Sequence, residues 1–333
     1  MSRRRDYVVT FTAAEQAELA ELPPDEKPLE ADEVAGRTLV SLISPGTEIA
    51  GSYVEGKFPS QPGYAAVFEV GDVGSGVDDL KAGDRVLASG PQGIGGHRSR
   101  QRCPRQAAVP VPDGLDPAVA AHARLMGVSM STLTTTTARP PEKVLVLGLG
   151  PVGNFAAQIF QACGYEVMAV DPLEPRCRLA QNMGVKDVRE AVPLDDKAAM
   201  EGIALALECS GHEQAAFDAC RAVRKRGEVV QIGVPRVRHT ELYAHDLLKA
   251  VYRRYVVLRI GWEWEIPRYG AEFRTGSVFG NLAAAARWLA EGRVRADGLY
   301  RTASPRDAQQ VYQDLLHRRG DGLTVAFDWS KVS

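Results

Sequence analysis

The sequence predicts two domains: an N-terminal, antiparallel β domain and a doubly wound α/β domain built on a parallel sheet. A chain of 333 residues is too long for one ordinary hydrophobic core. Between about Thr38 and Pro112, short strand-like runs are separated by Gly and Pro, whereas apolar strands and amphipathic helices alternate after Lys143. These three observations fix the predicted fold class as α/β with a separate β domain.

The β domain is predicted from four short β-type runs that lie between turn signals. They cover residues 37–43, 66–70, 84–87 and 107–111. Runs of this length, broken by turns, are typical of antiparallel, barrel-like domains. Two helices, over residues 116–125 and 128–138, are expected to follow, and the segment Arg139-Pro-Pro-Glu142 reads as a linker.

The α/β domain is predicted from the regular alternation that follows the linker. A helix and a strand in the tail are expected to return to the β domain. The predicted domains are therefore 1–125, completed by 295–333, and 126–294. The expected strands are 143–147, 165–170, 203–208, 228–232, 255–260 and 323–327, and the expected helices are 152–163, 175–183, 213–221 and 305–317.

Composition excludes several classes of partner. The formal net charge is -2, 45% of residues are hydrophobic, and no long basic or acidic block occurs, so nothing indicates nucleic-acid binding. No apolar segment of signal-peptide or membrane-spanning length is present, and we expect a cytoplasmic protein with no membrane partner. The five cysteines show no C-x-x-C spacing, which argues against a disulfide framework and a four-cysteine zinc lobe.

The strongest motif is Gly148-Leu-Gly-Pro-Val-Gly153, a G-x-G-x-x-G run between a predicted strand and a predicted helix. Gly148 would permit the tight turn, Gly150 would let a pyrophosphate approach the backbone, and Gly153 would let the helix pack on the strand. Pro151 suits the first helical turn because its missing N–H costs nothing there, and Val152 lies in the same turn. The motif predicts a dinucleotide site at the N-terminus of the helix.

Asp171 ends the next strand, 21 residues after Gly150. Its carboxylate can accept hydrogen bonds from both ribose hydroxyls of NAD but would repel the 2′-phosphate of NADP. Arg176, five residues further on, could accommodate that phosphate and weakens the argument. We expect NAD in preference to NADP.

Together these features resemble the medium-chain dehydrogenase/reductase superfamily, and the resemblance covers nearly the whole chain. Residues 62–74 resemble the family's G-H-E-x-x-G-x-V-x-x-V-G stretch, and residues 81–86 resemble its G-D-R-V turn. The resemblance implies a GroES-like β-barrel catalytic domain and a Rossmann cofactor domain. It also implies that Gly211 and Gly233, with the adjoining Ser210 and Val234, form turns at the edge of the cofactor.

The zinc ligands of the family's alcohol dehydrogenases are missing from the corresponding positions. The catalytic Cys is replaced by Pro45, the His of G-H-E by Tyr64, and the later acidic position falls near Arg124. None of these side chains is a zinc ligand, so the resemblance implies a zinc-free member. The runs 43–48 and 327–329 look most like the branch near bacteriochlorophyllide dehydrogenases and secondary-metabolite or sugar-alcohol oxidoreductases.

Without zinc, another group must manage the charge and the proton of the reacting oxygen. The candidates are Tyr64, Thr47, Arg124, Glu48 and His97. Tyr64 either takes part in catalysis or only fills the space of the zinc, Thr47 is either a proton relay or a capping hydroxyl, and Arg124 could pair with Glu48. His97 has a structural alternative as well. We expect Tyr64 and Thr47 to face the nicotinamide.

The segment 261–274 is aromatic, charged and loop-like, and it follows the last predicted strand of the α/β domain. It could be a substrate lid or an oligomer contact. In the superfamily the last strand commonly pairs across a two-fold axis, so we expect a homodimer.

The sequence thus predicts a zinc-independent, NAD(H)-dependent oxidoreductase that interconverts a secondary alcohol and a ketone on a polar, natural-product or sugar-like substrate. Two alternatives stay open. One is an NAD(P)H-dependent quinone or enoyl reductase, and the other is a nucleotide-binding protein that has lost its chemistry.

Overall fold

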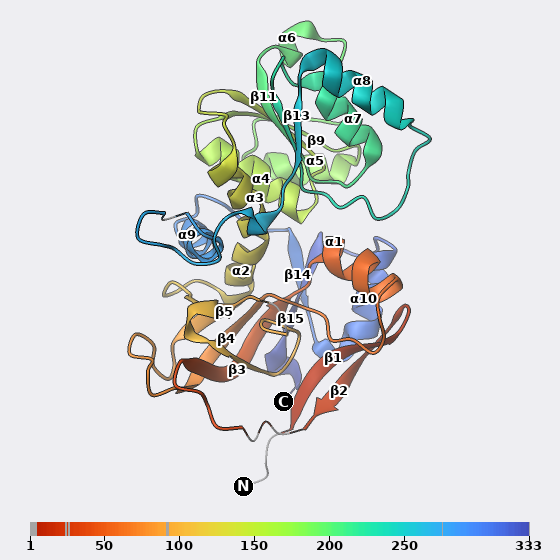
Figure 1. Cartoon of the computed structure of the whole chain (residues 1–333). Coiled ribbons are helices and arrows are strands. Elements are labelled where there is room, and N and C mark those ends of the chain that lie inside the picture. Colours follow the sequence, from red (N-terminus) through yellow and green to blue (C-terminus); the bar gives the residue numbers. More distant parts are fainter. Residues whose placement is uncertain (1–4, 24, 26, 91–92, 275, 333) are drawn as a thin grey trace. The chain divides into compact units, whose positions relative to one another are not determined.

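The computed structural model describes residues 5–23, 25, 27–90, 93–274 and 276–332, and these form two compact units. The β unit comprises Met1–Arg124, Leu282–Glu291 and Gly298–Ser333. The α/β unit comprises Leu125–Asn281 and Gly292–Asp297. The elements of each are labelled in Figure 1.

A six-stranded, fully parallel sheet forms the centre of the α/β unit. Its order is β10-β9-β8-β11-β12-β13, the doubly wound order in which the strand sequence reverses between β8 and β11. The predicted α/β fold class is confirmed. The strands are β8 (Lys143–Leu147), β9 (Glu166–Val170), β10 (Asp187–Arg189), β11 (Ile203–Glu208), β12 (Glu228–Gln231) and β13 (Val257–Ile260).

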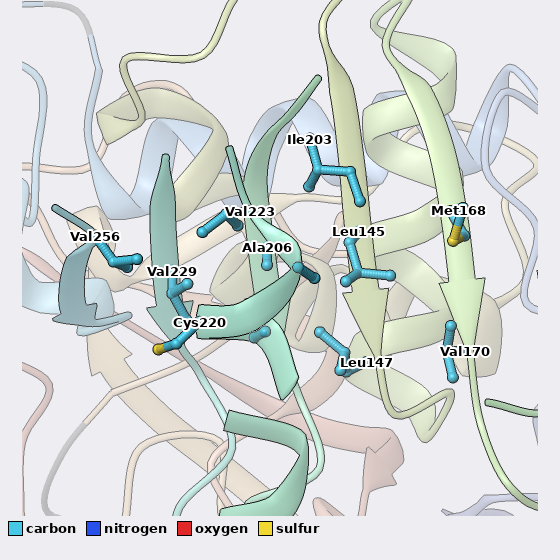
Figure 2. Packing of buried hydrophobic residues seen from close by; sticks show 12 residues of the cluster. Leu145, Leu147, Met168, Val170, Ile203, Ala206, Cys220, Val223, Val229 and Val256 are labelled. Atoms are coloured by element: carbon cyan, nitrogen blue, oxygen red, sulfur yellow. The ribbon is translucent and has the colours of Figure 1, made fainter. Parts of the chain in front are cut away.

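Helices connect these strands, and an apolar core lies under them. Figure 2 shows one face of the sheet, where Leu145 of β8, Met168 of β9 and Val229 of β12 pack with Cys220 of α7. All four side chains are buried, as expected for a parallel sheet covered by helices. The helices are α3 (Ala123–Thr135), α4 (Pro151–Ala162), α5 (Glu174–Asn182), α6 (Lys197–Met200), α7 (Glu213–Ala222) and α8 (Ala244–Arg254), with the 3-10 turn η3 (Glu263–Glu265).

A seven-stranded sheet organises the β unit. Its order is β14-β15-β3-β4-β5-β7, with β6 also paired to β3, and every pairing except β14 with β15 is antiparallel. Because β15 pairs with β3, the C-terminal segment joins this sheet as expected. The strands are β3 (Glu33–Leu42), β4 (Ala66–Val73), β5 (Arg85–Ala88), β6 (Arg100–Pro104), β7 (Ala108–Pro110), β14 (Tyr300–Ala303) and β15 (Thr324–Asp328).

A hairpin and several helices complete the β unit. The hairpin of β1 (Asp6–Ala13) and β2 (Gln16–Leu22) forms a separate two-stranded sheet. The helical elements are α1 (Pro45–Glu48), η1 (Ile49–Val54), η2 (Arg105–Ala107), α2 (Pro117–Ala121), η4 (Pro305–Asp307), α10 (Ala308–Leu316) and η5 (Trp329–Val332). The helix α9 (Val278–Ala290) begins in the α/β unit and belongs to the β unit from Leu282 on.

Several boundaries differ from the predicted ones. The helix predicted over 116–125 ends at Ala121, and the helix predicted to begin at Val128 begins at Ala123. The Asp116 side chain caps α2 by accepting from the N–H groups of Ala118 and Val119. The strand predicted from Tyr255 begins at Val257, because Tyr255 caps α8 in the left-handed conformation.

The β1–β2 hairpin and the helices α8 and α9 were not among the predicted elements. The turn of the hairpin contains Glu15 with φ 58° and has no Gly, Asn or Pro, so it carries none of the usual turn signals. In the part of the chain that the structure describes, no helix combines the length and the apolar character needed to cross a bilayer.

Candidate functional site

The predicted cofactor residues converge at one edge of the parallel sheet. Gly148 follows β8, Asp171 follows β9, Ser210 lies two residues after β11, and Gly233 lies two residues after β12. Because these strands are parallel, their carboxyl ends share an edge, and the strand order reverses there between β8 and β11. Ligands of doubly wound folds bind at this position.

The glycine-rich loop has the close backbone approaches that its motif requires. Gly148 has φ 88°, and a Cβ on it would lie 2.8 Å from the Cβ of Ser210. A Cβ on Gly153 would lie 1.7 Å from the carbonyl oxygen of Gly148. A Cβ on Gly150, in contrast, would meet no atom within 4 Å, so the loop is open on the side where a phosphate group would approach.

The helix α4 begins directly at this loop. Gly150 is its N-cap residue, and Pro151 is in the first turn, as predicted. The N–H groups of the first helical turn lack intrahelical acceptors and favour an anion there. Pro151 and Val152 are partly exposed, so the helix start is accessible.

The Asp171 carboxylate is buried and holds the glycine-rich loop in place. Oδ2 accepts a hydrogen bond from the N–H of Leu149 at 2.7 Å, and Oδ1 accepts from the N–H of Leu173 at 2.9 Å. Arg176 Nη1 also donates to Oδ2, at 3.2 Å, from a side chain that is 29% exposed. The ribose hydroxyls of a dinucleotide would therefore meet a carboxylate already held by Arg176.

A second buried carboxylate, Glu208, fixes the other two loops. Its Oε1 accepts from the N–H groups of Ser210 at 2.6 Å and Gly211 at 3.0 Å, and from the Ser210 hydroxyl. Its backbone carbonyl accepts from the N–H of Gly233 at 2.8 Å. Burial raises the pKa of Glu208, while the hydrogen bonds from Ser210 and Gly211 oppose that shift.

The loops after β11 and β12 touch at their glycines. A Cβ on Gly233 would lie 2.1 Å from the nitrogen of Gly211, and a Cβ on Gly211, which has φ 73°, would lie 2.5 Å from the carbonyl oxygen of Val234. The Val234 side chain is 59% exposed. The structure therefore brings Ser210, Gly211, Gly233 and Val234 together, next to the glycine-rich loop.

In the β unit, Tyr64 and Thr47 form a hydroxyl pair. The Tyr64 hydroxyl donates to Thr47 Oγ1 at 3.3 Å, and the guanidinium carbon of Arg124 lies 4.6 Å from the centre of the Tyr64 ring. Tyr64 is partly buried, Thr47 is exposed, and Arg124 is buried. The pair therefore presents a hydroxyl at the surface of the β unit, backed by a cation over the aromatic face.

Burial raises the pKa of Tyr64. Arg124 and hydrogen bonds with Ser44 and Thr47 act in the opposite direction, and the charge of Glu48 adds to the increase. A phenol with a raised pKa stays protonated near neutral pH, so Tyr64 is a hydrogen-bond donor under those conditions.

Glu48 and His97 lie beneath this pair, in a buried polar network. Glu48 Oε1 accepts from the N–H of Ser44 at 2.8 Å, and Oε2 accepts from His97 Nε2 at 3.0 Å and from the Tyr312 hydroxyl at 2.6 Å. His97 and Tyr312 are fully buried, and Glu48 is 2% exposed. The structure places Glu48 and His97 inside the β unit, away from its surface.

The other ring nitrogen of His97 extends the network. His97 Nδ1 lies 2.8 Å from Ser41 Oγ, and Trp329 Nε1 donates to the same oxygen at 2.9 Å. With Nε2–H donating to Glu48, Nδ1 accepts from the Ser41 hydroxyl, and each group has a partner.

Glu208, Ser41, Tyr312 and Trp329 are the residues that sequence reasoning missed. Glu208 carried a usable signal, because an acidic residue that ends an otherwise apolar strand needs hydrogen-bond donors. Ser41 and Tyr312 carried none, since each looks like an ordinary strand or helix residue.

The three positions that correspond to the family's zinc ligands carry other side chains. Pro45, Tyr64 and Arg124 do not offer zinc ligands. Within the described residues, no group of three or more His, Cys, Asp or Glu side chains is arranged to hold a metal ion. The residues present do not fit zinc coordination.

Comparisons with known proteins agree with this architecture. Residues 151–260 match the family model of zinc-binding dehydrogenases. The chain is similar to an alcohol dehydrogenase of Geobacillus stearothermophilus, with 27% identity over 55% of this chain and 63% of that protein. It is also similar to an L-threonine 3-dehydrogenase of Streptomyces coelicolor, with 27% identity over 82% of this chain and 83% of that protein.

A solved structure has the same fold over nearly the whole chain. Galactitol-1-phosphate dehydrogenase from Escherichia coli superposes with a TM-score of 0.80 over 97% of this chain and 99% of that chain, at 19% identity. At that identity the likeness concerns the fold. The family-model match lies within the α/β unit and does not include Pro45, Tyr64 or Arg124.

The Glu48 network generates a stability prediction. Glu48→Ala would leave three buried donors, the Ser44 N–H, His97 Nε2–H and Tyr312 O–H, without an acceptor, and each unsatisfied donor costs about 1–3 kcal/mol. We expect the free energy of unfolding to fall by about 3 kcal/mol or more in urea titrations followed by circular dichroism.

The exposed Glu69, on β4 of the same unit, is the matched control. Glu69→Ala should change the free energy of unfolding by less than about 0.5 kcal/mol. Equal urea midpoints for the two variants would contradict the assigned role of the network.

Proposed function

The sequence matches and the fold support assignment of this chain to the medium-chain dehydrogenase/reductase superfamily, and on that basis we propose that it is a zinc-independent, NAD(H)-dependent oxidoreductase. It interconverts a secondary alcohol and a ketone on a polar, natural-product or sugar-like substrate. The observation that carries this proposal is the Tyr64–Thr47 hydroxyl pair, in which Tyr64 takes the position that the resemblance gives to a zinc-binding His and Thr47 that of a proton-relay hydroxyl.

The residues at the carboxyl edge of the parallel sheet fit a nicotinamide dinucleotide. The open side of Gly150 and the first turn of α4 suit the pyrophosphate, and Asp171 suits the adenosine ribose. The nicotinamide, when bound, supplies hydride chemistry. The protein's own task is to orient the substrate and to manage the proton and charge on its oxygen.

The hydroxyl pair suits that task. Tyr64 donates to Thr47, so the Thr47 hydroxyl hydrogen is free to bond to the substrate oxygen. A ketone oxygen that gains negative charge would take a proton from the Thr47 hydroxyl, Thr47 would take one from the Tyr64 hydroxyl, and solvent would return a proton to the Tyr64 phenolate. In alcohol oxidation the proton takes the reverse path. Arg124 over the Tyr64 ring favours negative charge on the phenol oxygen during this transfer.

Glu48 and His97 are proposed to act as positioning residues for this pair. Glu48 holds the N–H of Ser44 and thereby the short helix α1, which carries Thr47. The backbone N–H of His97 donates to the carbonyl of Pro62 at 3.1 Å, and a Cβ on Gly63 would lie 2.8 Å from the backbone nitrogen of His97. The network therefore holds both segments that supply the hydroxyls.

A homodimer is the proposed assembly. β13 is an edge strand, and Val257 and Ile260 on it are 53% and 63% exposed. An exposed apolar edge strand favours pairing with a second copy. Analytical ultracentrifugation should report a dimer at micromolar concentration, and a monomer there would contradict this assignment.

The cofactor assignment predicts that NADH binds more tightly than NADPH, by roughly tenfold or more, because Asp171 would repel a 2′-phosphate. Fluorescence titration measures both affinities. Asp171→Ala should reduce the difference between the affinities for NADH and NADPH. Arg176→Ala should widen it, because Arg176 is the cation beside that carboxylate. Equal or tighter NADPH binding by the wild-type protein would overturn the NAD assignment.

The hydroxyl-pair assignment predicts that Tyr64→Phe lowers kcat by about a hundredfold or more while the affinity for NADH stays within about twofold. Phenylalanine keeps the ring under Arg124, so the variant tests the hydroxyl and leaves the packing intact. Thr47→Val should lower kcat by a similar factor. The first substrates to assay are a panel of polyols and their ketones.

Tyr64→Phe activity near that of the wild type would refute the role of the hydroxyl. Reduction of quinones or enones with no alcohol or ketone turnover would favour the alternative reductase. NADH binding without turnover of either substrate class would favour a non-catalytic protein.

A further inference from the structure

Two cavities in the β unit lie beside Arg98. A cavity of about 480 Å³ is lined by Thr10, Pro59, Ser60, Gln61, Gly93 and Arg98. None of these lining residues is acidic. Arg98 also lines a neighbouring cavity of about 380 Å³.

Two hydrogen bonds hold the backbone of Arg98, and a glycine lies beside its guanidinium group. Its N–H donates to the carbonyl of Gly96 at 2.9 Å, and its carbonyl accepts from the Thr38 hydroxyl at 2.6 Å. Gly93 has φ 83°, and a Cβ on it would lie 2.6 Å from Arg98 Nη2. A glycine at this position therefore makes room for the guanidinium group.

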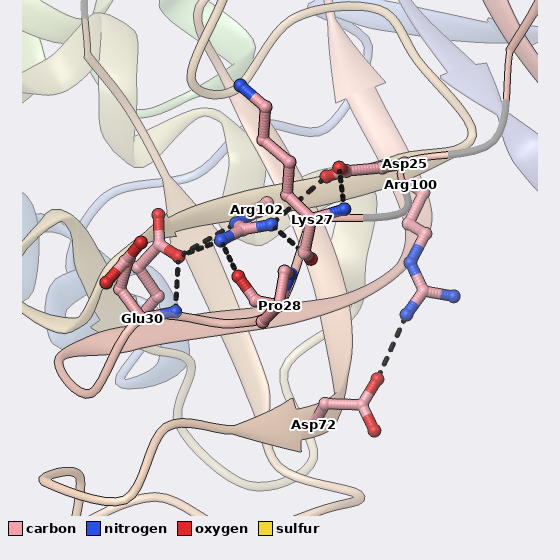
Figure 3. Close-up of polar contacts among 8 residues, drawn as sticks. Asp25, Lys27, Pro28, Glu30, Asp72, Arg100 and Arg102 are labelled. Carbon is pink, nitrogen blue, oxygen red and sulfur yellow. Dashed lines mark hydrogen bonds and ion pairs between the residues drawn. The ribbon is translucent and has the colours of Figure 1, made fainter.

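The carboxylates around the neighbouring cavity are already engaged with other groups. Figure 3 shows Arg100 beside Asp72 and Arg102 beside Asp25. Arg100 Nη2 lies 2.9 Å from Asp72 Oδ2, and Arg102 pairs with Glu33 as well. Asp6 accepts from the Ser99 hydroxyl at 3.0 Å. Each of these acids has its own donor, and none of them is paired with Arg98 in the described part of the chain.

Arg98 is thus a cation without a carboxylate partner among the described residues. Its Nη2 donates to Gln61 Oε1 at 3.0 Å, but its buried Nε has no hydrogen-bond partner in the part of the chain that the structure describes. Burial lowers the pKa of Arg98, although arginine stays charged in proteins. A half-buried guanidinium with an unsatisfied N–H is costly unless an anion completes it.

We propose that Arg98 and the cavity beside it form a binding site for a phosphate group, either free phosphate or the phosphate of a metabolite. The guanidinium fork can donate two hydrogen bonds to one oxyanion, and the hydroxyls of Thr10 and Ser60 can donate to the others. Neither hydroxyl is hydrogen bonded to another described residue. The described lining residues include no acid, which favours an anion over a neutral ligand.

The site is distinct from the dinucleotide site of the α/β unit, because every lining residue belongs to the β unit. It does not depend on the proposed oxidoreductase activity.

Isothermal titration calorimetry of the full chain with inorganic phosphate, at constant ionic strength, tests the proposal. The wild-type protein should bind phosphate saturably, and Arg98→Gln should weaken binding at least tenfold. Arg98→Lys keeps the positive charge but lacks the paired N–H donors of a guanidinium group, and it should weaken binding less than Arg98→Gln does. Arg100→Gln is the matched control, because Arg100 already has Asp72 as its partner, and it should change the affinity less than twofold.

A parallel titration with glycerol 3-phosphate separates the two sources of the phosphate group. Tighter binding than inorganic phosphate would identify a phosphorylated metabolite as the ligand, and equal or weaker binding would identify free phosphate. The proposal is overturned by absence of saturable binding, or by equal affinity in the wild type and Arg98→Gln. Circular dichroism spectra and melting curves establish that Arg98→Gln is folded. If that variant does not fold, the comparison of Arg98→Lys with Arg100→Gln decides, and equal affinity for those two overturns the proposal.

Discussion

The carboxylate of Glu48 accepts hydrogen bonds from three separate parts of the β unit, and the candidate site above it depends on all of them. One bond holds the start of α1, one holds His97, and one holds Tyr312 of α10. Because His97 also binds the segment before Tyr64, the network fixes the distance between Tyr64 and Thr47. A buried carboxylate with satisfied donors specifies one arrangement of its surroundings, since any other arrangement leaves a donor unpaired.

Buried carboxylates also hold loops in place at two positions of the α/β unit. Asp171 and Glu208 are buried carboxylates at the ends of parallel strands, and each accepts backbone N–H groups from the loops that follow. Loops at the carboxyl edge of a sheet lie outside its backbone hydrogen-bond ladder. Side-chain oxygens therefore accept hydrogen bonds from the N–H groups of these loops. The glycine approaches at Gly148, Gly211 and Gly233 then set how closely the loops meet.

Local patterns allowed the parallel sheet and the glycine-rich loop to be predicted from the sequence. The strand at 143–147 and the helix that follows Pro151 have periodicities and turn residues that act over a few positions. The β1–β2 hairpin was not predictable in this way, because its turn at Glu15 lacks the usual residues. The Ser41–His97–Glu48–Tyr312 network could not be predicted from the sequence either. Its members are up to 271 residues apart in the sequence and meet only through strand pairing and helix packing.

We propose that hydroxyl groups on this chain do what a zinc ion does in zinc-binding relatives. Metal analysis of the purified, active protein, with kcat measured before and after exhaustive dialysis against a chelator, tests that claim most directly. We predict no stoichiometric zinc and an unchanged kcat, because Pro45, Tyr64 and Arg124 offer no coordinating set. One zinc ion per chain, with activity lost on chelation and restored by added zinc, would contradict the account.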